Sequence, residues 1–269
     1  MIVHLIDGTY ELFRHFYGIR RGVAAPPRFS AITGVLGTVA QMIEQGATHI
    51  GVATDHIIES FRNDLWPGYK TGAGIDPLLK AQFHPLEGAL MAMGIKTWAM
   101  VEQEADDALA AAALRASQDK RVEKVCIWTP DKDLGQCVVG DRVVQMDRKS
   151  GQIRDEAGVI AKFGVAPKYI ADYLALVGDA ADGYPGIPRI GAKSAARLIS
   201  RYGAIEEFPP EVLGEHKEHA LLFKTLATLR TDADVFDDVD ELQWNGVTPQ
   251  FAEIARAMGD ERLATRLNR

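Results

Sequence analysis

The sequence predicts an α/β fold, in which helices flank a central parallel sheet and a helical region follows toward the C-terminus. Two observations carry this prediction. Through roughly residues 1–150, short apolar runs rich in β-branched residues alternate with stretches of helical periodicity, a pattern typical of parallel sheets. From about residue 155 the strand-like runs stop and only helical patterns continue. We therefore expect an α/β core over residues 1–155 and a helical region over residues 156–269.

Each expected strand is a short apolar run that ends near a turn-forming or acidic residue. The runs cover residues 2–6, 49–54, 95–100, 125–129 and 142–146. Apolar residues at helical spacing predict helices over residues 10–16, 32–43, 78–93, 104–117, 159–163, 167–177, 192–202 and 218–229. Glycine and proline mark loops at residues 22–27 and 67–77.

Composition places the chain among ordinary globular proteins. Of its 269 residues, 47% are hydrophobic and 25% are charged, which excludes disordered and collagen-like classes. Its two cysteines, Cys126 and Cys137, belong to no C-x-x-C or Cys/His set, which argues against a disulfide framework and a zinc site. No apolar run approaches the ~20 residues of a membrane span, and the first seven residues do not make a signal peptide. We expect a cytoplasmic monomer with no membrane partner.

The net charge of −7 by itself argues against a nucleic-acid partner. The charges are unevenly distributed, however. Residues 183–205 contain four bases and no acid, whereas residues 231–243 contain six acids and no base. The sign of the whole chain therefore decides little about its partners.

Acidic residues follow four of the predicted strands. Because the carboxyl ends of parallel strands meet at one edge of a sheet, we expect these acids to lie together. Two like charges ~4 Å apart repel by roughly 4 kcal/mol at an effective dielectric of ~20, so crowded carboxylates require protons or divalent cations. The acids are Asp7, Asp55, Glu104, Asp106, Asp107, Asp131 and Asp133, joined by Asp179 and Asp182 from the helical region.

Oxygen ligands without clustered cysteine or histidine favour Mg²⁺ or Mn²⁺ over Zn²⁺. Two such ions can activate a water molecule and stabilise the leaving oxygen of a phosphodiester. The alternative is that each acid is only a turn former or helix cap, the usual role of an aspartate that follows a strand. The coincidence of four strand ends and one helical-region loop favours the metal site.

A glycine-bounded turn and the helix after it have the pattern of a DNA contact. Glycines let backbone N–H groups approach a phosphate, and bases at every fourth position form a stripe on one helix face. Such contacts do not read base edges, so binding is expected to be independent of sequence. The alternative is a helix hairpin with a solvated basic face, and a Walker A loop is rejected because the spacing is one residue too long. The candidate residues are Gly186, Arg189, Gly191, Lys193, Ser194, Arg197 and Arg201.

Several motifs together resemble the 5′-nuclease family, which comprises the 5′→3′ exonuclease domain of bacterial DNA polymerase I and the flap endonucleases. Residues 101–107 (VEQEADD) resemble the family's V-x-x-x-E-A-D-D, and residues 129–134 (TPDKDL) resemble its T-x-D-K-D-[LM]. Residues 176–186 (LVGDAADGYPG) resemble L-x-G-D-x-S-D-N-x-P-G. The similarity covers roughly residues 1–230.

The resemblance implies a PIN-like α/β core with a helix-3-turn-helix module at about residues 170–205, and cleavage of DNA near 5′ ends and junctions by two or more Mg²⁺ ions. It implies that Asp7, Asp55, Glu104 and Asp106 bind a first metal, that Asp131, Asp133 and Asp182 bind a second, and that Asp107 and Asp179 are auxiliary acids. Lys70, at the base of an arch over residues 56–85, would orient the scissile phosphate with help from Arg62. A K⁺ at the helix-3-turn-helix is also implied.

The sequence departs from the family pattern in the arch and in the turn. Residues 56–85 contain three bases and three acids, fewer bases than a family arch usually has. Arg189 replaces the second glycine of G-x-P-G-x-G, and Gly183 stands where asparagine is usual. No polymerase domain follows, so we expect a free-standing nuclease.

Of three other functions, the first is disfavoured by the sequence and the other two remain open. A haloacid-dehalogenase-type phosphatase requires a nucleophilic aspartate where Leu5 stands. A catalytically weak DNA-junction-binding protein would have the same fold, and a toxin-type ribonuclease would have a similar but usually shorter core. Aromatic residues near the first helix are either core residues or stacking platforms for bases: Tyr10, Phe13, Phe16 and Tyr17.

Overall fold

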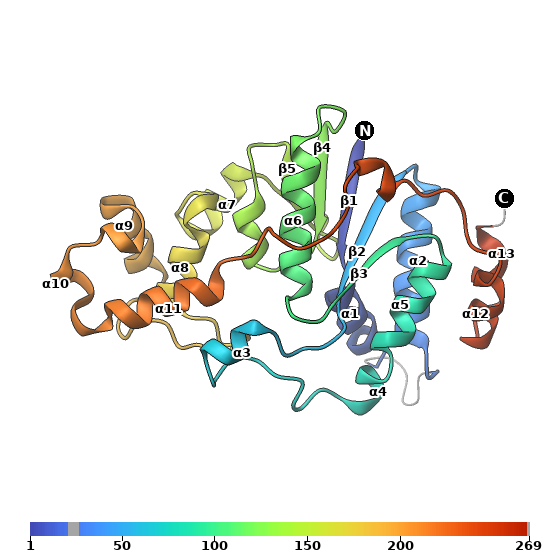
Figure 1. The fold of residues 1–269 in the computed structure, drawn as a ribbon, viewed down its shortest axis with the longest axis horizontal. Coiled ribbons are helices and arrows are strands. Elements are labelled where there is room, and N and C mark those ends of the chain that lie inside the picture. Colours follow the sequence, from blue (N-terminus) through green and yellow to red (C-terminus); the bar gives the residue numbers. More distant parts are fainter. Residues whose placement is uncertain (21–26, 268–269) are drawn as a thin grey trace.

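The fold is a six-stranded sheet covered by helices on both faces, with a separate group of helices at one end (Figure 1). The computed structural model describes residues 1–20 and 27–267. The sheet order is β3-β2-β1-β4-β5-β6, with β1 to β5 parallel and β6 antiparallel. The strands are β1 (Ile2–Asp7), β2 (His49–Asp55), β3 (Lys96–Met100), β4 (Lys124–Trp128), β5 (Val143–Asp147) and β6 (Gln152–Arg154). The predicted α/β class with a parallel sheet is confirmed.

Strand β6 has no counterpart among the five expected strands. It is three residues long and has no apolar run, so its composition does not distinguish it from a loop. It forms because a turn reverses the chain after β5: the Gly151 N–H donates to the Asp147 carbonyl at 2.8 Å, and Gly151 has a left-handed φ of 70°. Antiparallel pairing with β5 follows directly from that turn.

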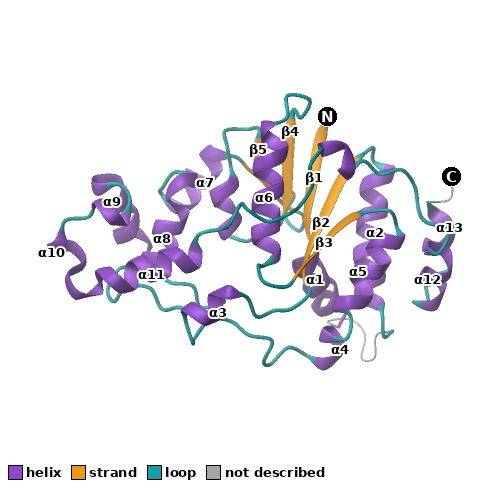
Figure 2. Cartoon of the chain, viewed as in Figure 1, coloured by secondary structure: helices purple, strands orange, loops and turns teal. Residues whose placement is uncertain are grey.

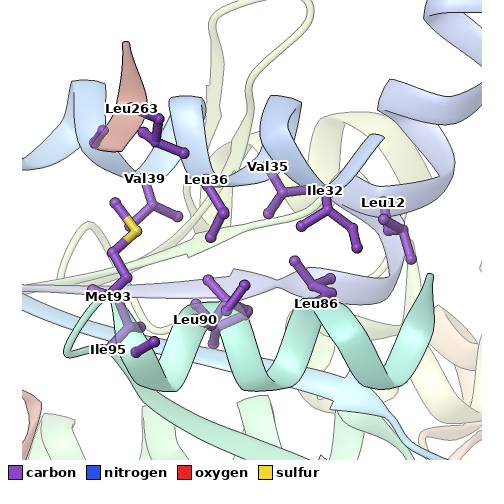
Figure 3. Packing of buried hydrophobic residues seen from close by; sticks show 14 of the residues in the cluster. Leu12, Ile32, Val35, Leu36, Val39, Leu86, Leu90, Met93, Ile95 and Leu263 are labelled. Atoms are coloured by element: carbon purple, nitrogen blue, oxygen red, sulfur yellow. The ribbon is translucent and has the colours of Figure 1, made fainter. Parts of the chain in front are cut away.

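Two helical layers enclose the sheet (Figure 2). Helices α1 (Gly8–Arg20), α2 (Ser30–Glu44) and α5 (Phe83–Ala92) pack on one face, and α6 (Ala105–Gln118) covers the other. The strands alternate accordingly: Ile6 packs against the first layer, whereas Leu5 packs beneath α6. Figure 3 shows the first layer, where side chains of α2 and α5 meet, among them Val35, Leu36, Leu86 and Leu90.

A second hydrophobic core lies within the group of helices at the far end, which we call the helical unit. It comprises α7 (Glu156–Phe163), α8 (Ile170–Val177), α9 (Ala192–Tyr202), α10 (Pro210–Leu213) and α11 (Lys217–Ala227). Within this unit, helices α8 and α11 pack against each other most extensively. All four helices expected after residue 155 are present.

The chain after the helical unit returns to the sheet. Trp98 Nε1 on β3 donates to the Val235 carbonyl at 2.7 Å, and Phe251 of α12 (Phe251–Ala257) joins the core beneath α2 and α5. Helix α13 (Leu263–Arg266) packs against α2. Residues from about 233 onward therefore lie on the α/β core, although we expected the helical region to run to residue 269. The boundary near residue 155 stays a prediction.

The arch segment (residues 56–85) contains two short helices, α3 (Phe61–Leu65) and α4 (Pro77–Lys80). The helix expected over residues 78–93 is divided into α4 and α5, because the Gln82 side chain bonds the Leu78 carbonyl and the Ile32 N–H at the break. Apart from residue 27, the loop expected at 22–27 lies outside the described residues. Among the described helices, none is long and apolar enough to cross a membrane.

Candidate active site and DNA interface

The predicted acids converge at the carboxyl ends of β1, β2 and β4. Asp7 and Asp55 are the last residues of β1 and β2, and Glu104 is the N-cap of α6. We call the converging acids the carboxylate rim: Asp7, Asp55, Glu104, Asp106, Asp131, Asp133, Asp179 and Asp182. Strand pairing brings together the acids that end or follow β1, β2 and β4, since β1 lies directly between the other two strands.

On the β1 side of the rim Asp7 is buried, Asp55 and Asp106 are half-buried, and Asp131 is exposed. Burial raises the pKa of Asp7 to about 7, and the charges of Asp55 and Asp131 add to that rise. Burial likewise raises the pKa of Asp106 well above its usual range, with further contributions from Asp131 and Asp7. Two hydrogen bonds hold Asp7 in place, from the Tyr10 N–H at 2.8 Å and from Thr129 Oγ1 at 3.1 Å. These carboxylates need a cation to be ionised together at neutral pH.

The other side of the rim has the geometry of a cation site. One carboxylate oxygen from each of Asp133, Asp179 and Asp182 lies within 4.8 Å of the others. Asp133 Oδ1 is buried without a hydrogen-bond partner, as is the Tyr184 hydroxyl. An unpartnered carboxylate oxygen among two further carboxylates fits a hard cation, whose preferred ligands are oxygens.

Two lysines partly neutralise the rim. Lys70 Nζ lies 2.8 Å from Glu104 Oε2 and 3.0 Å from Asp182 Oδ1, so it joins the two sides. Burial opposes ionisation of Glu104, but Lys70 and Arg62 outweigh it and lower the pKa of Glu104. Lys132 pairs with Asp179. The Lys70 side chain remains about one third exposed, so solvent reaches it.

Arg62 does not have the position that the resemblance implied. Arg62 is 1% exposed and forms a bidentate ion pair with Asp107, at 2.7 and 2.8 Å. Asp107 is fully buried and also accepts the N–H groups of Glu104 and Arg230. The expected role of Arg62 beside the scissile phosphate is therefore wrong in this geometry. The sequence shows that a basic residue stands at this position. It does not show whether that residue is exposed to a substrate or buried in an ion pair.

The turn before α9 exposes some candidate DNA ligands and buries another. Gly186 has a φ of 70° and is buried against the end of α8, where a Cβ would lie 2.3 Å from the Gly178 nitrogen. Packing against the end of α8 therefore explains by itself why a glycine is needed at position 186. Gly191 is different: it is exposed at the N-cap of α9, with no atom within 4 Å of a Cβ. Arg189 is exposed with a left-handed φ of 67°.

Helix α9 presents the predicted basic stripe to solvent. Lys193, Arg197 and Arg201 are exposed, while Ala195 and Ile199 are buried on the opposite face. Ser194 is half-buried. No described ion pair involves the three bases, so their charges remain available to a partner.

Two threonines belong to the site although the sequence reading passed over them. Thr9 Oγ1 accepts the Asp55 N–H at 2.8 Å, and Thr129 Oγ1 donates to Asp7. Each stands one or two residues from a rim acid or strand end, which is the signal that could have identified them. Of the four aromatics near the first helix, Phe16 is buried and Phe13 packs on the core, whereas Tyr17 is 47% exposed.

Comparison with protein families and known proteins agrees with this geometry. Residues 2–164 match the model of the 5′–3′ exonuclease N-terminal resolvase-like domain, and residues 165–250 match the 5′–3′ exonuclease C-terminal SAM fold. The 5′–3′ exonuclease of Aquifex aeolicus is 32% identical over 87% of this chain and 83% of its own length. The corresponding protein of Buchnera aphidicola (subspecies Acyrthosiphon pisum) is 31% identical over 87% and 88%.

Longer relatives and solved structures extend the comparison. DNA polymerase I of Pseudomonas aeruginosa is 31% identical over 88% of this chain, but the chain spans only 28% of that protein. T5 5′-exonuclease, solved with bound zinc, has a TM-score of 0.70 at 17% identity, covering 99% of this chain and 96% of its own. The catalytic core of Rad2 with DNA substrate has a TM-score of 0.62 at 14% identity, covering 95% and 86%. The two family models together cover most of the chain, which therefore belongs to the 5′–3′ exonuclease family.

Proposed function

We propose that this chain is a metal-dependent, structure-specific 5′ nuclease that hydrolyses DNA phosphodiesters near 5′ ends and single-strand/double-strand junctions. The carboxylate rim carries the proposal, because its acids converge from three strand ends and a helical-unit loop and outnumber the two lysines that pair with them. Four of these acids are buried: Asp7, Glu104, Asp133 and Asp179. The relatives named 5′–3′ exonuclease support the same activity.

The residues present fit two or more Mg²⁺ or Mn²⁺ ions. We assign Asp7, Asp55, Glu104 and Asp106 to one ion and Asp131, Asp133 and Asp182 to another, with Asp179 as an auxiliary acid. The raised pKa of Asp7 supports a cation at the first position. The unpartnered Asp133 Oδ1 supports a cation at the second. When bound, such ions lower the pKa of a coordinated water and neutralise charge on the phosphate oxygens.

The chain's own groups hold and orient the substrate. Lys70, which is partly exposed and pairs with Glu104 and Asp182, would neutralise the scissile phosphate. The exposed stripe on α9, Arg189 and the open Gly191 N–H would contact phosphates of a duplex without reading bases. A K⁺ held at the turn before α9 is part of the proposal, as are a cytoplasmic monomer and a DNA-binding role for the helical unit.

A catalytically weak junction-binding protein is the second candidate. The burial of Arg62 favours it, since the arch segment then offers Lys70 and Lys80 against three acids for gripping a 5′ strand. Metal-dependent binding of junctions without product formation would support this alternative.

The deciding experiment incubates end-labelled 5′-flap, nicked and blunt duplexes with the protein in EDTA, Mg²⁺ or Mn²⁺ and sizes the products. We expect cleavage near the junction only with metal, and its loss in Asp182→Asn. Asp141→Asn is the matched control, because this exposed acid precedes β5 at the opposite edge of the sheet. Equal turnover of both variants would contradict the site, and preferential cleavage of competing RNA would favour a ribonuclease.

A further inference from the structure

Arg62 sits where three parts of the molecule meet. It belongs to α3 in the arch segment, while its partners lie at the first turn of α6 and at the end of α11 in the helical unit. Nε donates to the Leu226 carbonyl at 2.8 Å, and Nη2 donates to the Thr228 carbonyl at 3.1 Å. The chain distance from Arg62 to these carbonyls exceeds 160 residues, so the contact is a tertiary tie.

The remaining donors of Arg62 point to acids at the first turn of α6. Nη1 and Nη2 bind the two oxygens of Asp107, and Nη1 also lies 3.2 Å from Glu104 Oε1. A guanidinium group has five N–H donors, and five acceptor atoms lie within 3.2 Å of its nitrogens here. No donor is left for a DNA phosphate.

Asp107 strengthens the same connection from the other side. Its Oδ2 accepts the Glu104 N–H at 3.0 Å, and its Oδ1 accepts the Arg230 N–H at 2.8 Å. Glu104 in turn accepts bonds from Ser60 Oγ and Lys70. The carboxylate of Glu104 is thus fixed by groups from the arch segment and, through the Arg62–Asp107 pair, by the end of α11.

On the basis of the proposed nuclease function, we propose that Arg62 is a positioning residue that ties the helical unit and the arch segment to the metal-site carboxylate of Glu104. It would not touch the substrate. The partners that orient a metal ligand typically contribute 10–100-fold to metal affinity or activity. Its removal is therefore expected to be felt first in metal binding.

The test compares metal-free protein variants for Mn²⁺ affinity by calorimetry or electron paramagnetic resonance, without DNA. Arg62→Met combined with Asp107→Asn removes both charges, so neither is left buried and unpaired, and the amide oxygen introduced in place of the carboxylate would still accept a backbone N–H. We expect about a tenfold loss of Mn²⁺ affinity and a similar loss in kcat, with DNA affinity in EDTA within about twofold of wild type. Arg62→Lys, with Asp107 unchanged, retains the positive charge but not the planar guanidinium group with its five donors. We expect this variant to be more stable than the double variant but to bind Mn²⁺ more weakly than wild type.

Lys224→Met is the matched control. Lys224 lies on the same helix α11, and its replacement breaks ion pairs with Asp172 and Glu206, neither of which contacts Glu104. Unchanged Mn²⁺ affinity in the folded double variant would overturn the inference, and if that variant fails to fold, unchanged affinity in Arg62→Lys would do so. A selective loss of DNA affinity would instead make Arg62 a DNA ligand. Because the Mn²⁺ comparison needs no turnover, a wild-type protein that binds Mn²⁺ but cleaves no DNA would contradict only the nuclease function.

Discussion

Divalent metal should stabilise this protein much more at pH 8 than at pH 5. A carboxyl group whose pKa is raised by folding holds a proton in the folded protein that it has lost in the unfolded chain. The contribution of Asp7 to the stability of the metal-free protein is therefore lost as the pH rises from 3.8 to about 7, the window between its ordinary and its folded pKa. Above that window a metal ion can replace the proton, whereas at pH 5 protons compete with it.

The size of the effect follows from the same group. A pKa raised from 3.8 to about 7 corresponds to about 4 kcal/mol of lost stability once Asp7 is ionised. One kcal/mol shifts the Tm of a protein of this size by ~2–4 °C, so full relief of this penalty is on the order of 10 °C. Half-buried His4 and His15, whose pKa values are lowered by desolvation to about 4, have the opposite pH dependence. They contribute equally with and without metal, and so they cancel in the difference.

The assay is differential scanning fluorimetry in EDTA and in saturating Mn²⁺ or Mg²⁺, from pH 5 to pH 8. We expect the difference in Tm between metal and EDTA to grow across this range, and Asp7→Asn to remove most of that growth. Asp141→Asn, an exposed acid far from the rim, should leave it unchanged. A difference in Tm that is independent of pH, or absent in both metals, would refute the assignment of the rim as a cation site.

Three further predictions concern the turn and α9. Gly186→Ala should lower the free energy of unfolding by about 3 kcal/mol, because the added Cβ would meet the end of α8. Gly191→Ser should leave the free energy of unfolding unchanged but weaken DNA binding. Thermal unfolding measures the first effect and fluorescence anisotropy with labelled DNA measures the second. Arg189→Gly should raise stability by about 1 kcal/mol by relieving its left-handed φ, while lowering DNA affinity in the same assays. Lys193→Gln or Arg197→Gln should weaken binding equally for all DNA sequences and lower the slope of log affinity against log salt by about 0.9, and an effect on one sequence alone would indicate base readout.

The sheet was predictable because each of its longer strands is a local apolar run. The run from Ile2 and the run from His49 are strand-like whatever surrounds them, and their order with intervening helices implies parallel pairing. Strand β6 and the return of residues 233–267 to the core depend on partners remote in sequence. Phe251 is as apolar as any residue of the helical unit, so composition cannot show that it joins the core of the α/β part.

The convergence of the acids was predictable for a similar reason. Parallel strands place their carboxyl ends at one edge, and Asp7 and Asp55 are the last residues of β1 and β2. The contribution of Asp182 could not be derived this way, because it depends on how the helical unit packs. Its position is fixed by a bond from the Lys70 N–H to the Asp182 carbonyl at 2.9 Å, which joins the arch segment to the helical-unit loop.

Arg62 and Lys70 show why charge in a sequence does not by itself indicate a phosphate ligand. Both are bases of the arch segment, eight residues apart, and both contact Glu104. Arg62 is 1% exposed and each of its donors has a partner within the protein, whereas the Lys70 side chain is 32% exposed and forms ion pairs with Glu104 and Asp182, two of the proposed metal ligands. A cation entering the rim would compete with Lys70 for those oxygens but would leave the Arg62–Asp107 pair intact. On these proposals the two bases have different roles: Lys70 would meet the substrate, whereas Arg62 would hold the Glu104 carboxylate in place.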